Sequence, residues 1–104
     1  MRFKNFEEML KLFPATIVLV NFHAAWCGPC KVMKKELARL SNMVGDRVKV
    51  FTVDTDRWPK LGARYEVSGL PTVLIFKNGR VCDRFEGIQK AEELVRRLEN
   101  FMVD

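Results

Sequence analysis

The segment Trp26-Cys27-Gly28-Pro29-Cys30 places two thiols three positions apart, directly after an apolar run and before a stretch of helical periodicity. The apolar run, residues 17–22, predicts a buried strand of a parallel-type sheet. A strand that delivers Cys-x-x-Cys to the start of a helix is typical of a redox site. Cys27 would then lie at the helix N-terminus, where unpaired N–H groups and the helix dipole favour the nucleophilic thiolate. Cys30 would lie one turn further on, within reach of a mixed disulfide at Cys27.

Length and composition favour one folded domain that covers residues 1–104. Hydrophobic residues make up 48% of the chain, which argues against disorder. No run approaches the ~20 apolar residues of a membrane span, so we expect no membrane partner. The N-terminal residues show no apolar signal core, and three cysteines do not make a secreted disulfide framework. We expect a cytoplasmic location, or an organelle stroma or matrix if a transit peptide has been removed.

The net charge of +5 is carried by Lys and Arg residues that are spread along the chain. This distribution favours a solvated basic surface, and we expect no nucleic-acid partner. The alternative is that the charge steers the chain toward acidic partner proteins.

Periodicity and turn signals predict an α-β-α-β-α-β-β-α order. The expected helices cover residues 5–13, 29–43, 57–65 and 90–102, and the expected strands cover residues 16–22, 47–55, 72–77 and 81–86. Asn5 is the expected cap of the first helix. Asn78-Gly79 predicts a two-residue hairpin turn. The residues of the second helix that we expect to face inward are Val32, Met33, Leu37, Leu40 and Val44.

A second unusual segment is Ser68-Gly69-Leu70-Pro71-Thr72, in which a proline opens a buried strand. Proline donates no hydrogen bond to a strand ladder, so its presence there needs a reason. A cis Leu70–Pro71 bond in a tight turn is one reason, and an ordinary trans turn is the alternative.

Three motifs in this order resemble the thioredoxin family over nearly the whole chain. They are the active-site motif Trp26–Lys31, the cis-proline loop Val67–Thr72 and the β-hairpin Phe76–Gly79. The resemblance implies the α/β thioredoxin fold, in which a central mixed sheet of four to five strands is flanked by four helices. Only Met1–Lys4 remain for the family's first strand, so we expect that strand to be vestigial or absent.

The resemblance implies a protein-disulfide reductase, which is a thiol–disulfide oxidoreductase. Cys27 would attack the disulfide of a client protein, and Cys30 would resolve the mixed disulfide to leave a redox-active Cys27–Cys30 disulfide. A thioredoxin reductase linked to NADPH or to ferredoxin would recycle a monomer that binds no cofactor and no metal. Gly28 and Pro29 resemble the reducing members, since oxidants usually have a His beside the second Cys.

The resemblance also assigns further site residues. The expected client-binding groove consists of Trp26, Gly69, Leu70, Gly87 and Ile88. The expected supporting residues are Trp26, Gly28, Pro29, Pro71, Asn21, Thr52 and His23. Asn21 and Thr52 stand where the family usually has a buried Asp and its Lys partner, and Asn cannot take a proton at neutral pH.

This replacement predicts a different or slower proton route at Cys30. For folding, we expect Asn21 and Thr52 to form a buried, hydrogen-bonded neutral pair that avoids the desolvation of charges. His23, the only histidine, follows Asn21 on the same strand face. It is either a replacement proton acceptor or an aromatic-like packing residue.

Two alternatives to a general reductase are open. One is a specialised reductase or isomerase with a narrow set of clients, and the other is a binding or assembly subunit that uses the fold without turnover. Cys82 stands alone in the last expected strand. It is either a small buried filler or a regulatory thiol.

Overall fold

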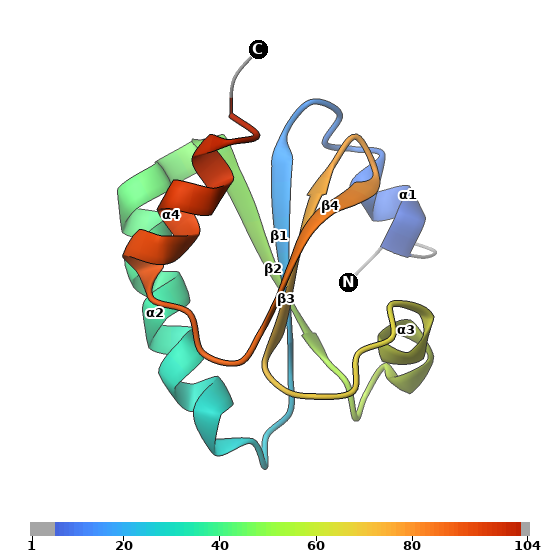
Figure 1. The fold of residues 1–104 in the computed structure, drawn as a ribbon. Coiled ribbons are helices and arrows are strands. Elements are labelled where there is room, and N and C mark those ends of the chain that lie inside the picture. The colour runs from blue at the N-terminus through green and yellow to red at the C-terminus, as the bar shows by residue number, and fades with distance from the viewer. Residues whose placement is uncertain (1–5, 103–104) are drawn as a thin grey trace.

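The structure is a computed structural model that describes residues 6–102. Its elements in chain order are α1 (Phe6–Leu10), β1 (Ile17–His23), α2 (Gly28–Val44), the 3₁₀ helix η1 (Gly45–Arg47), β2 (Val48–Asp54), α3 (Pro59–Arg64), β3 (Thr72–Lys77), β4 (Arg80–Glu86) and α4 (Ala91–Glu99). This order agrees with the predicted one (Figure 1). Asn5 and Met1–Lys4 lie outside the described residues, so the cap and the vestigial strand stay predictions.

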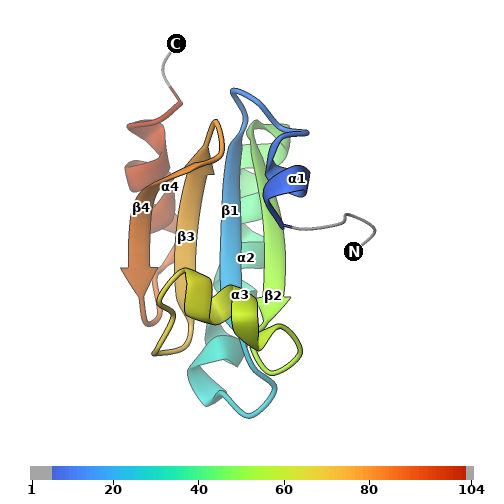
Figure 2. The ribbon, with the colours of Figure 1, turned by 90° about the vertical axis from the view of Figure 1, so that its right-hand side faces the viewer.

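The sheet has the strand order β2-β1-β3-β4, which Figure 2 shows face-on. β1 and β2 run parallel, whereas β3 is antiparallel to both β1 and β4. The predicted mixed sheet is therefore confirmed, with four strands in residues 6–102. β1 is central and is covered on both faces, which explains why its sequence is almost continuously apolar.

In residues 6–102, α2 and α4 cover one face of the sheet, and α1 and α3 cover the other (Figure 1). α2 and α4 pack on one face, where Leu19 of β1 meets Leu40 and Leu94 in one hydrophobic cluster. α1 packs on the other face, where Val20 of β1 meets Met9 in a second cluster, and α3 adds Leu61 there. Side chains that alternate along β1 thus supply both halves of the core.

α2 is a helix of 17 residues with a buried stripe and an exposed stripe. Met33, Leu37, Leu40 and Val44 are buried as predicted. The prediction for Val32 is wrong, since its side chain is 46% exposed. At 100° per residue, Val32 lies about a quarter turn or more away from each residue of the buried stripe, so it faces solvent.

The predicted hairpin turn joins β3 to β4. Asn78 and Gly79 have φ angles of 55° and 78°, which is the left-handed pair that a type I′ turn requires. α4 ends at Glu99, earlier than predicted, although Phe101 and Met102 still pack against the core. No helix in the described part of the chain combines the length and the apolar character needed to cross a bilayer.

Candidate active site

The two unusual segments of the sequence meet at one edge of the sheet. β1 ends at His23 and leads to Cys27, whereas β3 starts at Thr72, just after Pro71. Because β1 and β3 are antiparallel, with Phe22 opposite Thr72, the end of one strand lies beside the start of the other. Both connections lie at the lower end of the sheet in Figure 1.

Cys27 and Cys30 form a disulfide, with their Cα atoms 5.3 Å apart. Cys27 is the N-cap of α2, and its Sγ accepts a hydrogen bond from the backbone N–H of Cys30 at 3.2 Å. Pro29 lies in the first turn, where the backbone N–H that proline lacks would have no partner within the helix. Both cysteines are buried and cluster with Ala24 and Leu70. The helix start therefore holds the first sulfur against a backbone donor.

The Leu70–Pro71 bond is cis, so the cis alternative is correct. Pro71 is buried, and its carbonyl accepts a hydrogen bond from the N–H of Gly87 at 2.9 Å. Thr72 donates its hydroxyl to the carbonyl of Gly69 at 2.6 Å. The loop before β3 is thus held in a tight turn, with Gly69 exposed and Leu70 packed against the cysteines.

Trp26 presents an exposed indole next to the thiols. Its side chain is 71% exposed, and its Nε1–H donates to Oδ2 of Asp56 at 2.9 Å. Asp56 was missed by the sequence analysis. A signal for it existed, because β1 and β2 are parallel and the residues that follow each strand share one edge of the sheet. Ile88, another expected groove residue, is also exposed.

The predicted hydrogen-bonded pair of Asn21 and Thr52 is wrong. The two residues are register partners in β1 and β2, but Thr52 is exposed, since β2 is an edge strand. Asn21 is 3% exposed, and its Oδ1 atom is buried without a hydrogen-bond partner. The amide that replaces an ionisable group therefore remains unpaired beneath the site.

A pocket of about 520 Å³ opens between β1, β2 and α2, next to the second cysteine. Its lining residues are Asn21, His23, Ala24, Ala25, Cys30, Lys31, Lys34, Leu37, Ala38, Ser41, Val50 and Thr52. His23 follows Asn21 on the strand face that α2 covers, as predicted. The structure thus brings Cys30, Asn21, His23 and Thr52 to one cavity.

Cys82 is half-buried in β4, more than fifty positions after Cys30 in the chain. Its thiol donates to the carbonyl of Ile75 at 3.4 Å. Burial raises the pKa of this thiol, and the nearby Asp83 carboxylate raises it further. A raised pKa favours the protonated thiol, as in a packing residue. Within residues 6–102, no three His, Cys, Asp or Glu side chains come together as a metal site.

A Cys-x-x-Cys disulfide that caps a helix, with a cis-proline beside it on a mixed sheet, defines a thiol–disulfide oxidoreductase of the thioredoxin fold. A family model described as Thioredoxin matches residues 1–100. The chain therefore belongs to the thioredoxin family, and dithiol–disulfide exchange is the chemistry that its cysteine pair supports.

Relatives and solved structures agree with this assignment. The chain is 41% identical over 98 residues to the chloroplastic thioredoxin Y of Oryza sativa subsp. japonica, covering 94% of this chain and 58% of that protein. It is 39% identical over 101 residues to a thioredoxin-like protein of Synechocystis sp., covering 97% of this chain and 95% of that protein. The thioredoxin of Fasciola hepatica has a TM-score of 0.83 and 27% identity, with coverage of 91% of this chain and 89% of that one. The chain thus spans little more than half of the rice protein but nearly all of the cyanobacterial one.

Proposed function

We propose that residues 1–104 act as a single-domain protein-disulfide reductase. The Cys27 thiolate attacks one sulfur of a client disulfide, forms a mixed disulfide, and releases the other client sulfur as a thiolate. Cys30 then loses its proton and attacks the Sγ of Cys27. This second step releases, as a thiolate, the client sulfur that was bound to Cys27, and it leaves the Cys27–Cys30 disulfide. Two electrons have then passed to the client.

The N-cap geometry of Cys27 is the observation that carries these roles. The Cys30 N–H that points to Sγ of Cys27 in the disulfide can donate to a thiolate in the reduced form, and the helix dipole adds to this effect. The two cysteines are similarly buried, at 4% and 6% exposure, so the difference between them is that Cys27 caps the helix and Cys30 lies inside its first turn. The cap position, and not burial, therefore supports Cys27 as the nucleophile and Cys30 as the resolving thiol.

Reduction is the proposed direction in the cell. Gly28 and Pro29 add no positive side chain between the cysteines. A cation or His there would stabilise the Cys27 thiolate, favour the reduced protein and make it an oxidant of other thiols. Its absence supports a protein that gives its electrons away.

Clients are proposed to bind over the exposed side of the site. Trp26 and Ile88 offer exposed apolar surface, and Leu70 packs against the cysteines. Gly69 and Gly87 lie on the two connections that flank Pro71, and neither has a side chain to block an approaching peptide. These five residues form the proposed groove.

His23 is proposed to accept the proton that leaves Cys30. It lines the same pocket as Cys30 and the unpaired Asn21 amide, and no carboxylate is among the lining residues. Among the residues that line the pocket, His23 is the one histidine, the side-chain type that most often acts as a general base. Packing as an aromatic-like residue is the competing role.

A His23→Gln variant tests this proton route. We expect its single-turnover reduction of insulin to slow by about tenfold or more near neutral pH, since general-base catalysis is typically worth ~10²–10⁴-fold. The pH dependence between about pH 6 and pH 8 should also flatten. Rates that match the parent's throughout this range would leave His23 with packing alone.

Recycling by a thioredoxin reductase is part of the proposal, and the electron source is either NADPH or ferredoxin. The named chloroplastic and cyanobacterial relatives support a ferredoxin-linked partner and a stroma-like or bacterial cytoplasmic location. Similarity to the mitochondrial thioredoxin of Mus musculus, 44% identical over 79 residues, supports the NADPH-linked alternative in a matrix. Coupled turnover of the chain with each class of reductase, in parallel, discriminates the two.

Insulin reduction with dithiothreitol tests the function itself. We expect activity in the parent, loss of turnover in Cys27→Ser, and a trapped mixed disulfide with the client in Cys30→Ser. Turnover that survives in Cys30→Ser would refute the two-thiol mechanism. A parent that binds a protein without reducing any disulfide would instead favour a binding or assembly subunit.

A further inference from the structure

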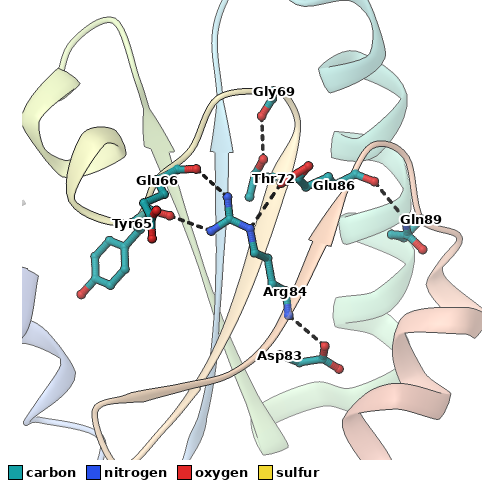
Figure 3. Close-up of polar contacts among 8 residues, drawn as sticks. All are labelled: Tyr65, Glu66, Gly69, Thr72, Asp83, Arg84, Glu86 and Gln89. Atoms are coloured by element: carbon teal, nitrogen blue, oxygen red, sulfur yellow. Dashed lines mark hydrogen bonds and ion pairs between the residues drawn. The ribbon is translucent and has the colours of Figure 1, made fainter.

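The side chain of Arg84 connects the edge strand β4 to the loop in front of β3. Its Nη1 donates to the carbonyl of Tyr65 at 2.6 Å, and its Nη2 donates to the carbonyl of Glu66 at 2.7 Å. Its Nε lies 3.4 Å from a carboxylate oxygen of Glu86 on the same strand. Figure 3 shows the guanidinium group between these partners.

The two carbonyls belong to the point where the chain leaves α3. Tyr65 is the C-cap residue that follows Arg64 at the end of this helix, and Glu66 has a φ of 56°, in the left-handed region. The last carbonyls of a helix have no partner within the helix and are commonly satisfied by a basic side chain. Arg84 supplies this from a different element, 18 or 19 positions away in the chain. The planar fork of the guanidinium can reach both oxygens at once.

The loop of residues 67–71 begins directly after these two carbonyls. Its other end is held by the Thr72 hydroxyl on the carbonyl of Gly69, and by the N–H of Gly87 on the carbonyl of Pro71. Between the two anchors, Ser68 and Gly69 are exposed, and Leu70 packs against the cysteine cluster. The loop's position beside the thiols depends on these anchors together with the N–H of Val67, which donates to the carbonyl of Gly62 at 2.9 Å, and on the packing of Val67 and Leu70 in the second hydrophobic cluster.

We propose that Arg84 is a positioning residue that fixes the start of the 67–71 loop and thereby shapes the groove that receives client proteins. The inference rests on the proposed function of this groove. Arg84 touches neither the thiols nor the client in this role. Its loss loosens the loop at Gly69 and Leu70 but leaves the cap of α2 and the Cys27–Cys30 pair in place.

The substitution Arg84→Met tests the proposal, because it keeps most of the aliphatic stem and removes every donor. Arg84→Lys keeps the charge but lacks the planar pair of donors that reaches both carbonyls at once. It should therefore restore the parent's behaviour incompletely. Arg80→Ala is the matched control, since it removes an exposed arginine from the same strand.

Two substrates separate positioning of the groove from an effect on the thiols. With insulin, we expect Arg84→Met to raise KM by about three- to tenfold with kcat changed by less than about twofold, as for lost binding contacts. With hydroxyethyl disulfide, which is too small to need the groove, its rate should equal the parent's. Equal losses on both substrates, or no loss on insulin, would overturn the proposal.

Amide hydrogen exchange gives a readout that does not depend on turnover. We expect exchange of the Val67 amide, which donates to the carbonyl of Gly62 at 2.9 Å, to become about tenfold faster in Arg84→Met, since hydrogen bonds from charged groups are among the stronger ones and their loss permits local opening. Exchange in β1 and α2 should stay unchanged, which excludes general unfolding. Unchanged exchange in the loop would refute positioning by Arg84. If the parent reduced neither substrate, the proposed function would fail, and the exchange data would still decide whether Arg84 positions the loop.

Discussion

At the scale of single residues, Asn21 is the least satisfied group near the site. Its amide is buried and its Oδ1 has no hydrogen-bond partner, an arrangement that typically costs ~1–3 kcal/mol. The atom belongs to a residue that lines the Cys30 pocket, where a transferred proton or a solvent molecule would find an acceptor. The unpaired Oδ1 of Asn21 therefore belongs to the pocket in which the proposed proton transfer from Cys30 needs polar groups.

Replacement of Asn21 by aspartate should make stability depend on pH. Burial raises the pKa of a carboxyl group above its unfolded value of ~3.9, because the charged form is poorly solvated. Below about pH 4 the Asn21→Asp variant therefore stays protonated in both states. As the pH rises toward the folded-state pKa, its free energy of unfolding should fall by ~1.4 kcal/mol per unit relative to the parent, and then level off.

Urea unfolding of the variant and the parent across this pH range measures the effect. Asn100→Asp, at the exposed C-cap of α4, is the control and should lose no more than ~1 kcal/mol as its carboxyl ionises, the size of a helix-dipole effect. A stability difference between Asn21→Asp and the parent that is constant with pH would contradict the burial argument. In single-turnover reduction, the new carboxylate should also raise the rate or shift its pH profile, because it adds a proton acceptor to the pocket.

The Cys27–Cys30 disulfide and the cis Leu70–Pro71 bond were predictable from the sequence, whereas the environments of the residues around them were not. Cys27, Cys30 and Pro71 follow from local motifs, so a reading of neighbouring residues finds them. The exposure of Thr52 does not follow in this way, because it depends on β2 being an edge strand. The hydrogen bonds from Trp26 to Asp56 and from Arg84 to Tyr65 likewise join segments that are far apart in the sequence. Hydrophobic periodicity describes one segment at a time and does not predict such contacts.

At the scale of elements, the start of α4 is capped from another helix. Lys90, its N-cap residue, makes no side-chain cap, whereas Glu36 of α2 accepts the backbone N–H of Ala91 at 2.9 Å. The same carboxylate oxygen accepts from Arg39 at 2.6 Å, and Arg39 also pairs with Glu92. This hydrogen bond to Arg39 lowers the pKa of the exposed Glu92. One carboxylate thus links the helix that carries the cysteines to the last helix.

We expect Glu36→Ala to lower the free energy of unfolding by ~1 kcal/mol, the typical cost of a lost helix cap. Glu36→Gln keeps an acceptor oxygen for Ala91 and should recover a large part of this loss. Urea unfolding measures both, and Glu99→Ala, at an exposed position at the end of α4, is the control. Equal stability of Glu36→Ala and the parent would show that solvent replaces the cap without cost.

Element positions were predictable where the pattern is local. The strand Thr72–Lys77 agrees with its predicted bounds, because Pro71 directly precedes it and the turn Asn78-Gly79 directly follows it. The inward position of Val32 was wrong because hydrophobicity alone does not give the azimuth of a side chain on the helix. α4 was predicted to reach Met102 but ends at Glu99. Phe101 and Met102 pack against the core from a turn that follows the helix.

At the scale of the whole molecule, helical layers enclose a sheet that has four strands in residues 6–102, and the site lies where β1 ends and β3 begins (Figure 1). Part of the chain's excess positive charge lies near the site, because Lys31 and Lys34 are exposed on α2 beside the second cysteine. Exposed charges near a docking surface change encounter rates more than they change stability. The alternative in which the charge steers the chain toward acidic clients therefore predicts an effect of the lysines beside the thiols.

Reduction of an acidic disulfide peptide should consequently depend on salt. Between about 0.01 M and about 1 M ionic strength, the Debye length shrinks from ~30 Å to ~3 Å, which screens attraction to the lysines of α2. We expect the bimolecular rate constant to fall by about tenfold over this range, whereas the rate with uncharged hydroxyethyl disulfide stays flat. At low salt, Lys34→Glu should slow the acidic peptide by about two- to fivefold. Lys11→Glu, the same charge change on the chain after α1, should not. If both variants slowed the peptide equally, net charge would direct the encounter and the surface beside the thiols would have no special part in it.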